Sequence, residues 1–365
     1  MQVTLVVHGL NGGGVARVVT WLAGRLADDG HGVHIVARTA AELDAYPLDP
    51  RVRVTRVAPP VWPRQAKRPV RLFAFGAMAR YVSWRDRADV VVSFIAETNV
   101  VVGLLMLGSR RPHVAVESSH PFARADEDPT LVARCRPWLY RRAAQVVVLT
   151  DDVAAMVDRQ WRVERVSVVP NPAPTIAAAP PPMRDRPPLV LAVGSLRDIK
   201  DHHTLLEAWA LARARHGGWQ LVVLGEGPNR AGLADTVRRL ELADTVTMPG
   251  WAADVLAHMQ RASIFVLPSR VEGFGNVLVE ALASGCACIA TDCPGGPPHI
   301  LGHGRFGRLV PVGDPAAMAA AIDELAGDLA TREQMADAGS ARAADYSEAS
   351  VYGRWRSVID AAARG

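Results

Sequence analysis

Short apolar strands that alternate with helical stretches are the feature that most limits the fold of this 365-residue chain. The strand-like segments are apolar throughout, which indicates strands buried on both faces of a sheet. Such strands need helices on both sides, so the pattern predicts doubly wound α/β domains with parallel sheets. In the first half, the predicted strands cover residues 3–8, 33–37, 52–57, 90–94, 114–116, 146–149 and 166–169.

A proline-rich stretch divides the chain into two such regions. Residues 170–188 hold 8 of the 26 prolines, and proline suits neither a helix interior nor a central strand. After this stretch the alternation starts again, with predicted strands at 189–193, 220–224, 245–248, 264–267 and 288–291. We therefore predict a first domain over 1–170, an extended linker over 171–188 and a second domain over 189–345.

Composition narrows the classes of function. No apolar run approaches the ~18 residues of a membrane span, and the first residues show neither the basic stretch nor the cleavage site of an export signal, so we expect a cytoplasmic protein. The 4 cysteines have a spacing that matches none of the usual zinc patterns. We therefore expect no metal site.

Charge is distributed unevenly along the chain. Residues 1–170 carry 23 Lys and Arg against 16 Asp and Glu, whereas residues 171–365 carry 18 against 21. A basic first half favours an anionic surface or substrate at that domain. Arginines spread over solvated faces are the alternative explanation.

Two predicted strands end in loops that suit an anion. The glycine-rich residues 9–14 precede a predicted helix over 15–27, where glycine lets the backbone approach a ligand and a helix N-terminus supplies N–H donors; a plain tight turn is the alternative. Lys200 follows strand 189–193 near a predicted helix start, where its charge opposes the helix dipole. Because the only other lysine is Lys67, this position favours contact with a phosphate over a solvated side chain.

The loop and helix after strand 264–267 hold the most candidate ligand contacts. Glu272 lies in the loop, and Glu280 lies about one turn into a helix that we expect to begin near Asn276. Carboxylates accept charge-assisted hydrogen bonds from paired hydroxyls such as those of a ribose, and the first amides of the helix suit a phosphate. An ordinary loop acid would explain Glu272 alone, but the two glutamates together predict a ligand with hydroxyls and phosphates.

The sequence from Glu272 to Glu280, Glu-Gly-Phe-Gly-Asn-Val-Leu-Val-Glu, resembles the Glu-x7-Glu signature of family 4 retaining glycosyltransferases. Further segments resemble the same family over nearly the whole chain, at 12–19, 169–172, 224–228, 248–251, 291–296 and 307–314. The resemblance implies the GT-B fold, in which two Rossmann-like, doubly wound α/β domains face a central cleft. It also implies a helix over 346–365 that returns to the first domain.

The activity that the resemblance implies is transfer of a hexose or N-acetylhexosamine from a nucleotide-sugar, by default a UDP-sugar, with no metal and no other cofactor. In this family pattern His120, Glu272 and Lys200 would form the catalytic group, and Glu280 would bind the ribose; a structural histidine is the alternative for His120. The remaining contacts would be with the donor sugar through Gly273, Phe274, Gly275 and Asn276, with the diphosphate through Gly13, Gly14, Ser195, Arg197, Lys200, Asn276, Val277 and Leu278, and with the base through Gly225, Met248, Pro249 and Gly250.

One residue departs from the family pattern. Many members have Gly-Arg-Leu where this chain has Gly194-Ser195-Leu196, and that arginine shares the diphosphate with the lysine. Because Ser195 carries no charge, either Arg197 takes over this contact or Lys200 and the helix N-terminus suffice. We expect the departure to affect donor affinity more than activity.

The acceptor would bind the first domain. Residues 62–87 hold seven basic residues against one acid, and aromatic residues interleave with them, as in helices that lie on an anionic bilayer. This favours a lipid-linked glycan acceptor and peripheral contact with the inner face of the cell membrane; an exposed arginine-rich helix is the alternative. Nucleic acid is not expected, since no nucleic-acid-binding motif accompanies the charge.

Three other functions stay open on the sequence. The acceptor could be a small soluble natural product instead of a glycolipid. The architecture is shared by nucleotide-sugar 2-epimerases. A non-catalytic subunit that binds a sugar nucleotide is the third, and Ser195 is the feature that favours it.

Overall fold

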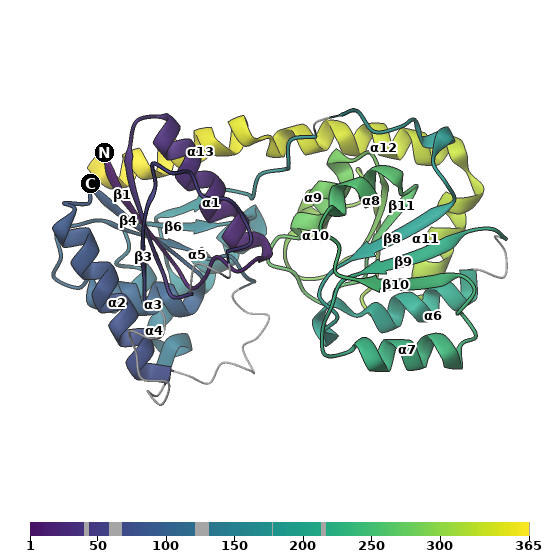
Figure 1. The fold of residues 1–365 in the computed structure, drawn as a ribbon, viewed down its shortest axis with the longest axis horizontal. Coiled ribbons are helices and arrows are strands. Elements are labelled where there is room, and N and C mark those ends of the chain that lie inside the picture. The colour runs from purple at the N-terminus through teal and green to yellow at the C-terminus, as the bar shows by residue number, and fades with distance from the viewer. Residues whose placement is uncertain (40–43, 58–67, 121–130, 177, 213–216, 365) are drawn as a thin grey trace. The chain divides into compact units, whose positions relative to one another are not determined.

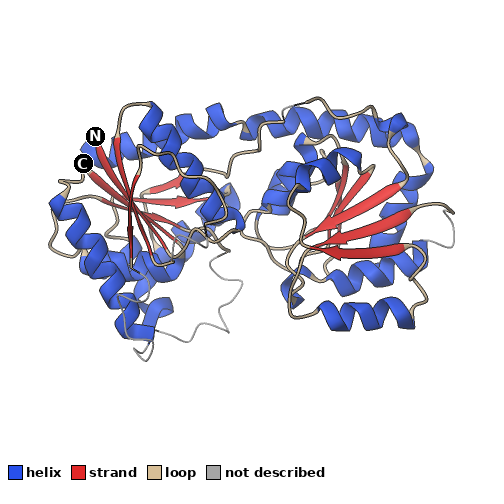
Figure 2. Ribbon diagram, in the orientation of Figure 1, coloured by secondary structure: helices blue, strands red, loops and turns tan. Residues whose placement is uncertain are grey.

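The computed structural model describes residues 1–39, 44–57, 68–120, 131–176, 178–212 and 217–364. The chain forms two compact units, one of Met1–Asn171 with Ala349–Gly365 and one of Pro172–Glu348. In each unit a sheet has helices on both of its faces (Figures 1 and 2). The predicted α/β class, with two doubly wound parallel sheets, is therefore confirmed.

The described residues of the first unit form a seven-stranded parallel sheet with the order β3-β2-β1-β4-β5-β6-β7. Its strands are β1 (Gln2–Val7), β2 (Gly32–Ala37), β3 (Arg53–Arg56), β4 (Val90–Phe94), β5 (His113–Val116), β6 (Gln145–Val148) and β7 (Val166–Val168). The chain builds outward from β1 in one direction and from β4 in the other. The sheet therefore has its topological switch point between these two strands, where doubly wound sheets bind ligands.

Helices pack on this sheet through apolar faces spaced at the helical period. On the first helix, for example, Val18, Leu22 and Leu26 are buried in the same core as the strands. The helices are α1 (Gly13–Asp28), α2 (Arg68–Arg85), α3 (Ala96–Leu105), α4 (Leu131–Tyr140), α5 (Asp151–Trp161) and α13 (Glu348–Arg364).

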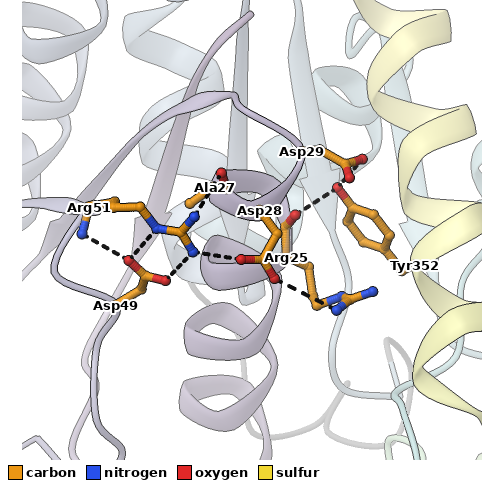
Figure 3. Close-up of polar contacts among 7 residues, drawn as sticks. All are labelled: Arg25, Ala27, Asp28, Asp29, Asp49, Arg51 and Tyr352. Carbon is orange, nitrogen blue, oxygen red and sulfur yellow. Dashed lines mark hydrogen bonds and ion pairs between the residues drawn. The ribbon is translucent and has the colours of Figure 1, made fainter.

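The helix α13 completes the first unit from the far end of the chain. Trp355 and Ile359 are each 1% exposed in the core of that unit, and the Trp355 ring lies 6.1 Å from the ring of Phe94 on β4. The Tyr352 hydroxyl lies 2.8 Å from a carboxylate oxygen of Asp29 (Figure 3). Burial and the neighbouring Asp29 raise the pKa of Tyr352, so it stays a neutral donor that ties α13 to the end of α1.

The described residues of the second unit form a six-stranded parallel sheet with the order β10-β9-β8-β11-β12-β13. Its strands are β8 (Leu189–Val193), β9 (Gln220–Leu224), β10 (Val246–Gly250), β11 (Ile264–Leu267), β12 (Ala287–Thr291) and β13 (Arg308–Val310). The switch point here lies between β8 and β11. The strand β13 is absent from the sequence prediction.

The helices of the second unit cover both faces of its sheet and bury their apolar residues against it. They are α6 (His202–Ala212), α7 (Arg230–Arg239), α8 (Val255–Arg261), α9 (Asn276–Ala283), α10 (Gly296–Ile300), α11 (Pro315–Gly327) and α12 (Leu329–Ala343), with single 3-10 turns η2 (Met183–Asp185), η3 (Asp198–Lys200) and η4 (Ala344–Tyr346).

The proline-rich stretch packs on the second unit. The guanidinium of Arg186 donates hydrogen bonds to the carbonyls of Ala262 at 2.8 Å and Ser284 at 2.9 Å. These contacts satisfy two carbonyls that end helices α8 and α9. In the part of the chain that the structure describes, no helix combines the length and the apolar character that a membrane crossing requires.

Candidate functional site

Two loops meet at the switch point of the second unit, one after β8 and one after β11. The backbone N–H of Arg270 donates to the carbonyl of Ile199 at 2.9 Å, and the Arg270 guanidinium lies 3.0 Å from a carboxylate oxygen of Asp201. Because β8 and β11 are neighbours in a parallel sheet, both loops leave from the same edge. These contacts join the two loops into one surface.

The ion pair of Lys200 and Glu272 lies in this surface. The ammonium Nζ of Lys200 is 2.5 Å from Oε1 of Glu272, and their side chains are 21% and 8% exposed. Ser269 Oγ donates to the same carboxylate oxygen at 2.7 Å. The structure therefore brings together two residues, 72 positions apart, that the sequence analysis places at a ligand independently.

Lys200 belongs to the 3-10 turn η3, not to the start of helix α6. The turn ends at Asp201, whose φ of 45° is left-handed. The side chain of Asp201 then accepts hydrogen bonds from the backbone N–H of Thr204 at 3.4 Å and from the Thr204 hydroxyl at 2.9 Å. Asp201 caps α6 in this way. The chain reversal that it makes directs Lys200 toward the β11 loop.

A pair of glycines after β12 fixes the backbone of the Glu272 loop. The N–H of Glu272 donates to the Pro294 carbonyl at 3.1 Å. A Cβ at Gly295 would lie 1.8 Å from the carbonyl oxygen of Glu272, and a Cβ at Gly296 would lie 1.7 Å from that of Phe274. Only glycine permits this approach, so the β12 loop holds Glu272 in place.

Helix α9 begins directly after this loop. Gly275 precedes it with a φ of 95°, and the Leu278 amide donates to the Gly275 carbonyl at 2.9 Å. Of the residues predicted to shape the sugar pocket, Phe274 is buried with its ring 5.6 Å from that of Tyr346. Gly275 and Leu278 are buried as well, and the other predicted contacts around α9 are half-buried, namely Gly273, Asn276, Val277 and Glu280.

The predicted base contacts lie where β8, β9 and β10 end. The Gly225 N–H donates to the Gly250 carbonyl at 2.8 Å, and a Cβ at Gly225 would lie 1.9 Å from the Gly194 carbonyl oxygen. The guanidinium of Arg230 donates to the Met248 carbonyl at 2.8 Å. Close backbone packing therefore fixes the relative positions of the ends of β8, β9 and β10.

The remaining predicted residues of this edge are exposed. They are Ser195, Arg197 and Pro249. Trp251, which ends the family-like segment 248–251, is also exposed, with 76% of its surface accessible. The Ser195 carbonyl accepts a hydrogen bond from the Arg197 N–H at 2.9 Å. The exposed side chains of Ser195 and Arg197 leave this segment accessible beside η3.

A buried histidine lies beneath the β8 loop. His202 is 3% exposed, and a Cβ built on Gly194 would lie 3.6 Å from its Nε2 and 3.7 Å from Cδ of Lys200. Burial, together with the charge of Lys200, lowers the pKa of His202 to about 4. The sequence analysis assigns no role to His202, Asp201, Ser269 or Arg270, because their contacts depend on which strands are neighbours.

His120, Gly13 and Gly14 belong to the first unit. Gly13 and Gly14 begin α1 after Gly12, whose φ is 107°. His120 follows β5 and is 9% exposed; burial lowers its pKa, so the imidazole is neutral near neutral pH. The structure thus groups the predicted site residues into two sets, one in each unit.

No three His, Cys, Asp or Glu side chains gather as a metal site requires, within the residues that the structure describes. Burial raises the pKa of Cys286 to about 12 and that of Cys293 to about 11. Thiolates bind metals, so these shifts disfavour Cys286 and Cys293 as ligands.

Two family models match the chain, "Glycosyltransferase Family 4" over residues 12–175 and "Glycosyl transferases group 1" over residues 187–328. The chain is 24% identical to the amylovoran biosynthesis glycosyltransferase AmsD of Erwinia amylovora, over 98% of this chain and 99% of that protein. It is 25% identical, over 98% of both, to a Campylobacter jejuni enzyme described as a GalNAc-alpha-(1->4)-GalNAc-alpha-(1->3)-diNAcBac-PP-undecaprenol alpha-1,4-N-acetyl-D-galactosaminyltransferase.

Among solved structures, HepE of Anabaena in complex with UDP is similar with a TM-score of 0.80. The identity is 17%, over 99% of this chain and all of that one, so this likeness concerns the fold. The two family models together match most of the chain, and the first match ends within four residues of the boundary between the two units, which lies after Asn171. The chain therefore belongs to the family 4 glycosyltransferases, with the GT-B fold.

Proposed function

We propose that this protein is a retaining, metal-independent glycosyltransferase that uses a UDP-sugar and transfers a hexose or N-acetylhexosamine to a lipid-linked glycan. The ion pair of Lys200 and Glu272 carries the proposal. Each member of the pair suits one part of a nucleotide-sugar, because the ammonium pairs with a diphosphate and the carboxylate accepts sugar hydroxyls. The UDP complex of HepE and the undecaprenol-linked glycan named for the Campylobacter relative support the choice of substrates.

In this reaction the bond between the anomeric carbon and the phosphate oxygen breaks, and its electron pair leaves with UDP. Lys200 would stabilise the charge that develops on the diphosphate, assisted by the N-terminus of α9. The acceptor hydroxyl would bond to the same face of the sugar and pass its proton to the leaving phosphate. Glu272 would orient the sugar, and Glu280 would accept the ribose hydroxyls.

An exposed aromatic face on α2 supports an acceptor at a membrane. Phe73 and Trp84 are 63% and 65% exposed and lie eleven residues apart, which is three helical turns. Arg80, Tyr81 and Arg85 are exposed on the same helix. We propose that this face contacts an anionic bilayer. The predicted segment 62–87 continues into 62–67, which lies outside the described residues.

The first experiment is a thermal-shift screen of the purified protein with UDP-, GDP-, dTDP- and ADP-sugars, with Glu280→Ala beside it. A ligand at a hundredfold excess over its Kd stabilises the native state by about 2.7 kcal/mol. We expect a shift with UDP-sugars that Glu280→Ala loses. A shift with another nucleotide corrects the donor, and no shift with any of them contradicts a nucleotide-sugar site in this protein.

The second experiment measures transfer and stereochemistry with the donor so found. An undecaprenyl-diphosphate glycan and a soluble glycoside serve as acceptors, with EDTA present throughout. NMR of the product should show the anomeric configuration of the donor. An inverted product refutes the retaining mechanism, transfer only to the soluble glycoside refutes the lipid-linked acceptor, and exchange at C2 of the sugar without transfer indicates a 2-epimerase.

The membrane contact is tested by sedimentation with phosphatidylglycerol vesicles and with phosphatidylcholine vesicles. Binding should require the anionic lipid and weaken in Phe73→Ser/Trp84→Ser. The matched control is Trp251→Ser, which removes an equally exposed aromatic ring from the second unit. Equal binding by both variants would refute the role of α2.

A further inference from the structure

A buried network of polar side chains runs from His113, the first residue of β5, to Glu117, which follows that strand and precedes His120 by three residues. Its members come from β4, β5, α3, α4 and the residue after β5, and each is at most 9% exposed. They are His113, Ser93, Asn99, Tyr140, Glu117 and Arg136, and we call them the Glu117 network. The sequence analysis assigns no role to any of them.

In the Glu117 network each side chain donates a hydrogen bond to the next one, from His113 toward Glu117. Asn99 Nδ2 donates to the Val116 carbonyl at 2.9 Å and to the Tyr140 hydroxyl at 2.8 Å. The Asn99 oxygen accepts from Ser93 Oγ at 2.7 Å. Since Ser93 has a single hydrogen, the His113 Nε2, also 2.7 Å from Ser93 Oγ, must be the donor to that oxygen.

The chain of donors ends on the carboxylate of Glu117. The Tyr140 hydroxyl donates to Oε2 of Glu117 at 2.8 Å, and the guanidinium of Arg136 lies 3.4 Å from the same oxygen. Burial and the charge of Glu117 raise the pKa of Tyr140 well above its usual value, so the phenol keeps its proton. Hydrogen bonds aligned in this way polarise one another, which strengthens the bond on the final acceptor.

The same carboxylate also holds the segment that leads to His120. Ser119 Oγ donates to Oε1 of Glu117 at 3.0 Å, although Ser119 itself is exposed. The backbone N–H of Glu117 donates to the Val147 carbonyl at 2.8 Å. Both the backbone and the side chain of Glu117 are therefore fixed where the strand ends, three residues before His120.

A buried ion pair is a costly way to stabilise a fold. Apolar residues of similar volume often stabilise as well or better, because the two charges must give up water. A charged network that ends three residues before His120 fits a role in geometry better than a role in stability. Misplacing a reacting group by about 1 Å costs on the order of a hundredfold in rate.

We propose that Glu117 is a positioning residue that holds residues 117–120, and with them His120, in the orientation that glycosyl transfer requires. The proposal rests on the proposed function, since His120 acts only if the protein transfers a sugar. It extends that function by a residue that contacts neither donor nor acceptor. Tyr140, Asn99, Ser93 and His113 then act through Glu117.

The test is a double-mutant cycle on transfer, with Glu117→Gln, His120→Ala and the double variant. Glu117→Gln keeps the shape of the side chain but removes its charge. We expect it to lower kcat about tenfold or more while the donor KM, set in the second unit, stays within twofold. If Glu117 acts through His120, the double variant should be no slower than His120→Ala alone.

Asp86→Asn is the matched control. Asp86 is also a buried, paired carboxylate of the first unit, 2.6 Å from His34 Nδ1, but it precedes β4 at the opposite edge of the sheet. With the soluble glycoside as acceptor, whose transfer needs no membrane contact, it should lower the melting temperature as Glu117→Gln does and leave kcat within twofold. If Glu117→Gln does not fold, Tyr140→Phe replaces it, because this change removes a single hydroxyl, which donates to Glu117 and accepts from Asn99.

Each outcome decides a separate question. Multiplied losses in the double variant, or equal kcat losses in Asp86→Asn and Glu117→Gln, overturn the positioning role. A fully active Glu117→Gln protein overturns it as well. If the wild-type protein consumes none of the nucleotide-sugars, the proposed function is refuted, and the role of Glu117 in transfer is refuted with it.

Discussion

The two units place charge at the carboxyl edges of their sheets in different ways. In the second unit, Lys200 and Glu272 form a partly exposed ion pair, and the Glu272 carboxylate also accepts a hydrogen bond from the Ser269 hydroxyl. In the first unit, Glu117 is fully enclosed by Tyr140, Arg136 and Ser119. Because the pair of Lys200 and Glu272 is partly exposed, a ligand can replace either partner. The buried network around Glu117 instead keeps the backbone after β5 in one position.

Breaking the ion pair of Lys200 and Glu272 should have the largest effect. Lys200→Ala removes the cation that stabilises the leaving diphosphate, and we expect kcat/KM to fall by about 10²–10³-fold, with loss of the thermal shift by UDP-sugars. Arg239→Ala, which removes an exposed cation at the end of α7 in the same unit, is the control and should change kcat/KM less than twofold. Equal losses in both variants would show that charge in general, and not the partner of Glu272, is what matters.

Displacing the backbone of Glu272 should have the second largest effect, and this effect is a loss of stability. In Gly295→Ala the new methyl group would lie 1.8 Å from the Glu272 carbonyl oxygen, at a φ of +116°. We expect the free energy of unfolding to fall by about 3 kcal/mol or more, measured by denaturant titration. Gly217→Ala, where nothing lies within 4 Å of the added carbon, should stay within about 0.5 kcal/mol of wild type.

Acid should destabilise both units through buried histidines, namely His202 in the second unit and His113, with His34 and His120, in the first. Burial lowers the pKa of His113 and of His202 to about 4, so between pH 6.5 and 4 the unfolded chain binds a proton that the folded chain does not. Stability is therefore complete above pH 6.5 and falls as the pH drops, by about 1.4 kcal/mol per pH unit for each histidine. Amide hydrogen exchange at pH 7, 6 and 5 measures this for each unit.

The two histidines should then differ when they are replaced. Neither ring nitrogen of His202 has a hydrogen-bond partner among the described residues, so His202→Leu should flatten the pH dependence of the second unit at little cost at pH 7. His113→Leu should reduce the pH dependence of the first unit without abolishing it, because His34 and His120 remain. It should also destabilise this unit at pH 7, because Ser93 loses its donor. A second unit whose pH dependence is unchanged in His202→Leu would contradict the assignment.

The smallest effect should come from adding a positive charge at Ser195, in the same loop as Lys200. Ser195 is exposed and contributes its carbonyl to the turn, so Ser195→Arg should fold normally. We expect a donor KM that is lower by about threefold to tenfold, as for an added charge-assisted hydrogen bond at a partly exposed site. Ser195→Gln, which is long but uncharged, should leave KM unchanged; an equal gain in both variants would exclude a charge effect.

Strand positions were predictable because buried parallel strands are apolar runs; β4, β8 and β11 begin and end at the predicted residues. Strand β13 was missed because it has three residues and begins with Arg308. Lys200 and Glu272 were each identified from their local surroundings, but their contact depends on β8 lying beside β11, which no local pattern contains. Glu117 was missed for the same reason, since Tyr140 and Asn99 come from two helices.

The contacts of α13 with the first unit impose an order on synthesis. The ribosome makes the first 171 residues before the second unit, yet the first unit still lacks Trp355 and Ile359 in its core. The second unit, which is continuous in sequence, can finish folding first. The first unit meanwhile holds an apolar gap where α13 will pack, and must wait through the synthesis of some 180 further residues before closing it. During that interval the apolar surface that α13 later covers stays exposed, and exposed apolar surface promotes aggregation.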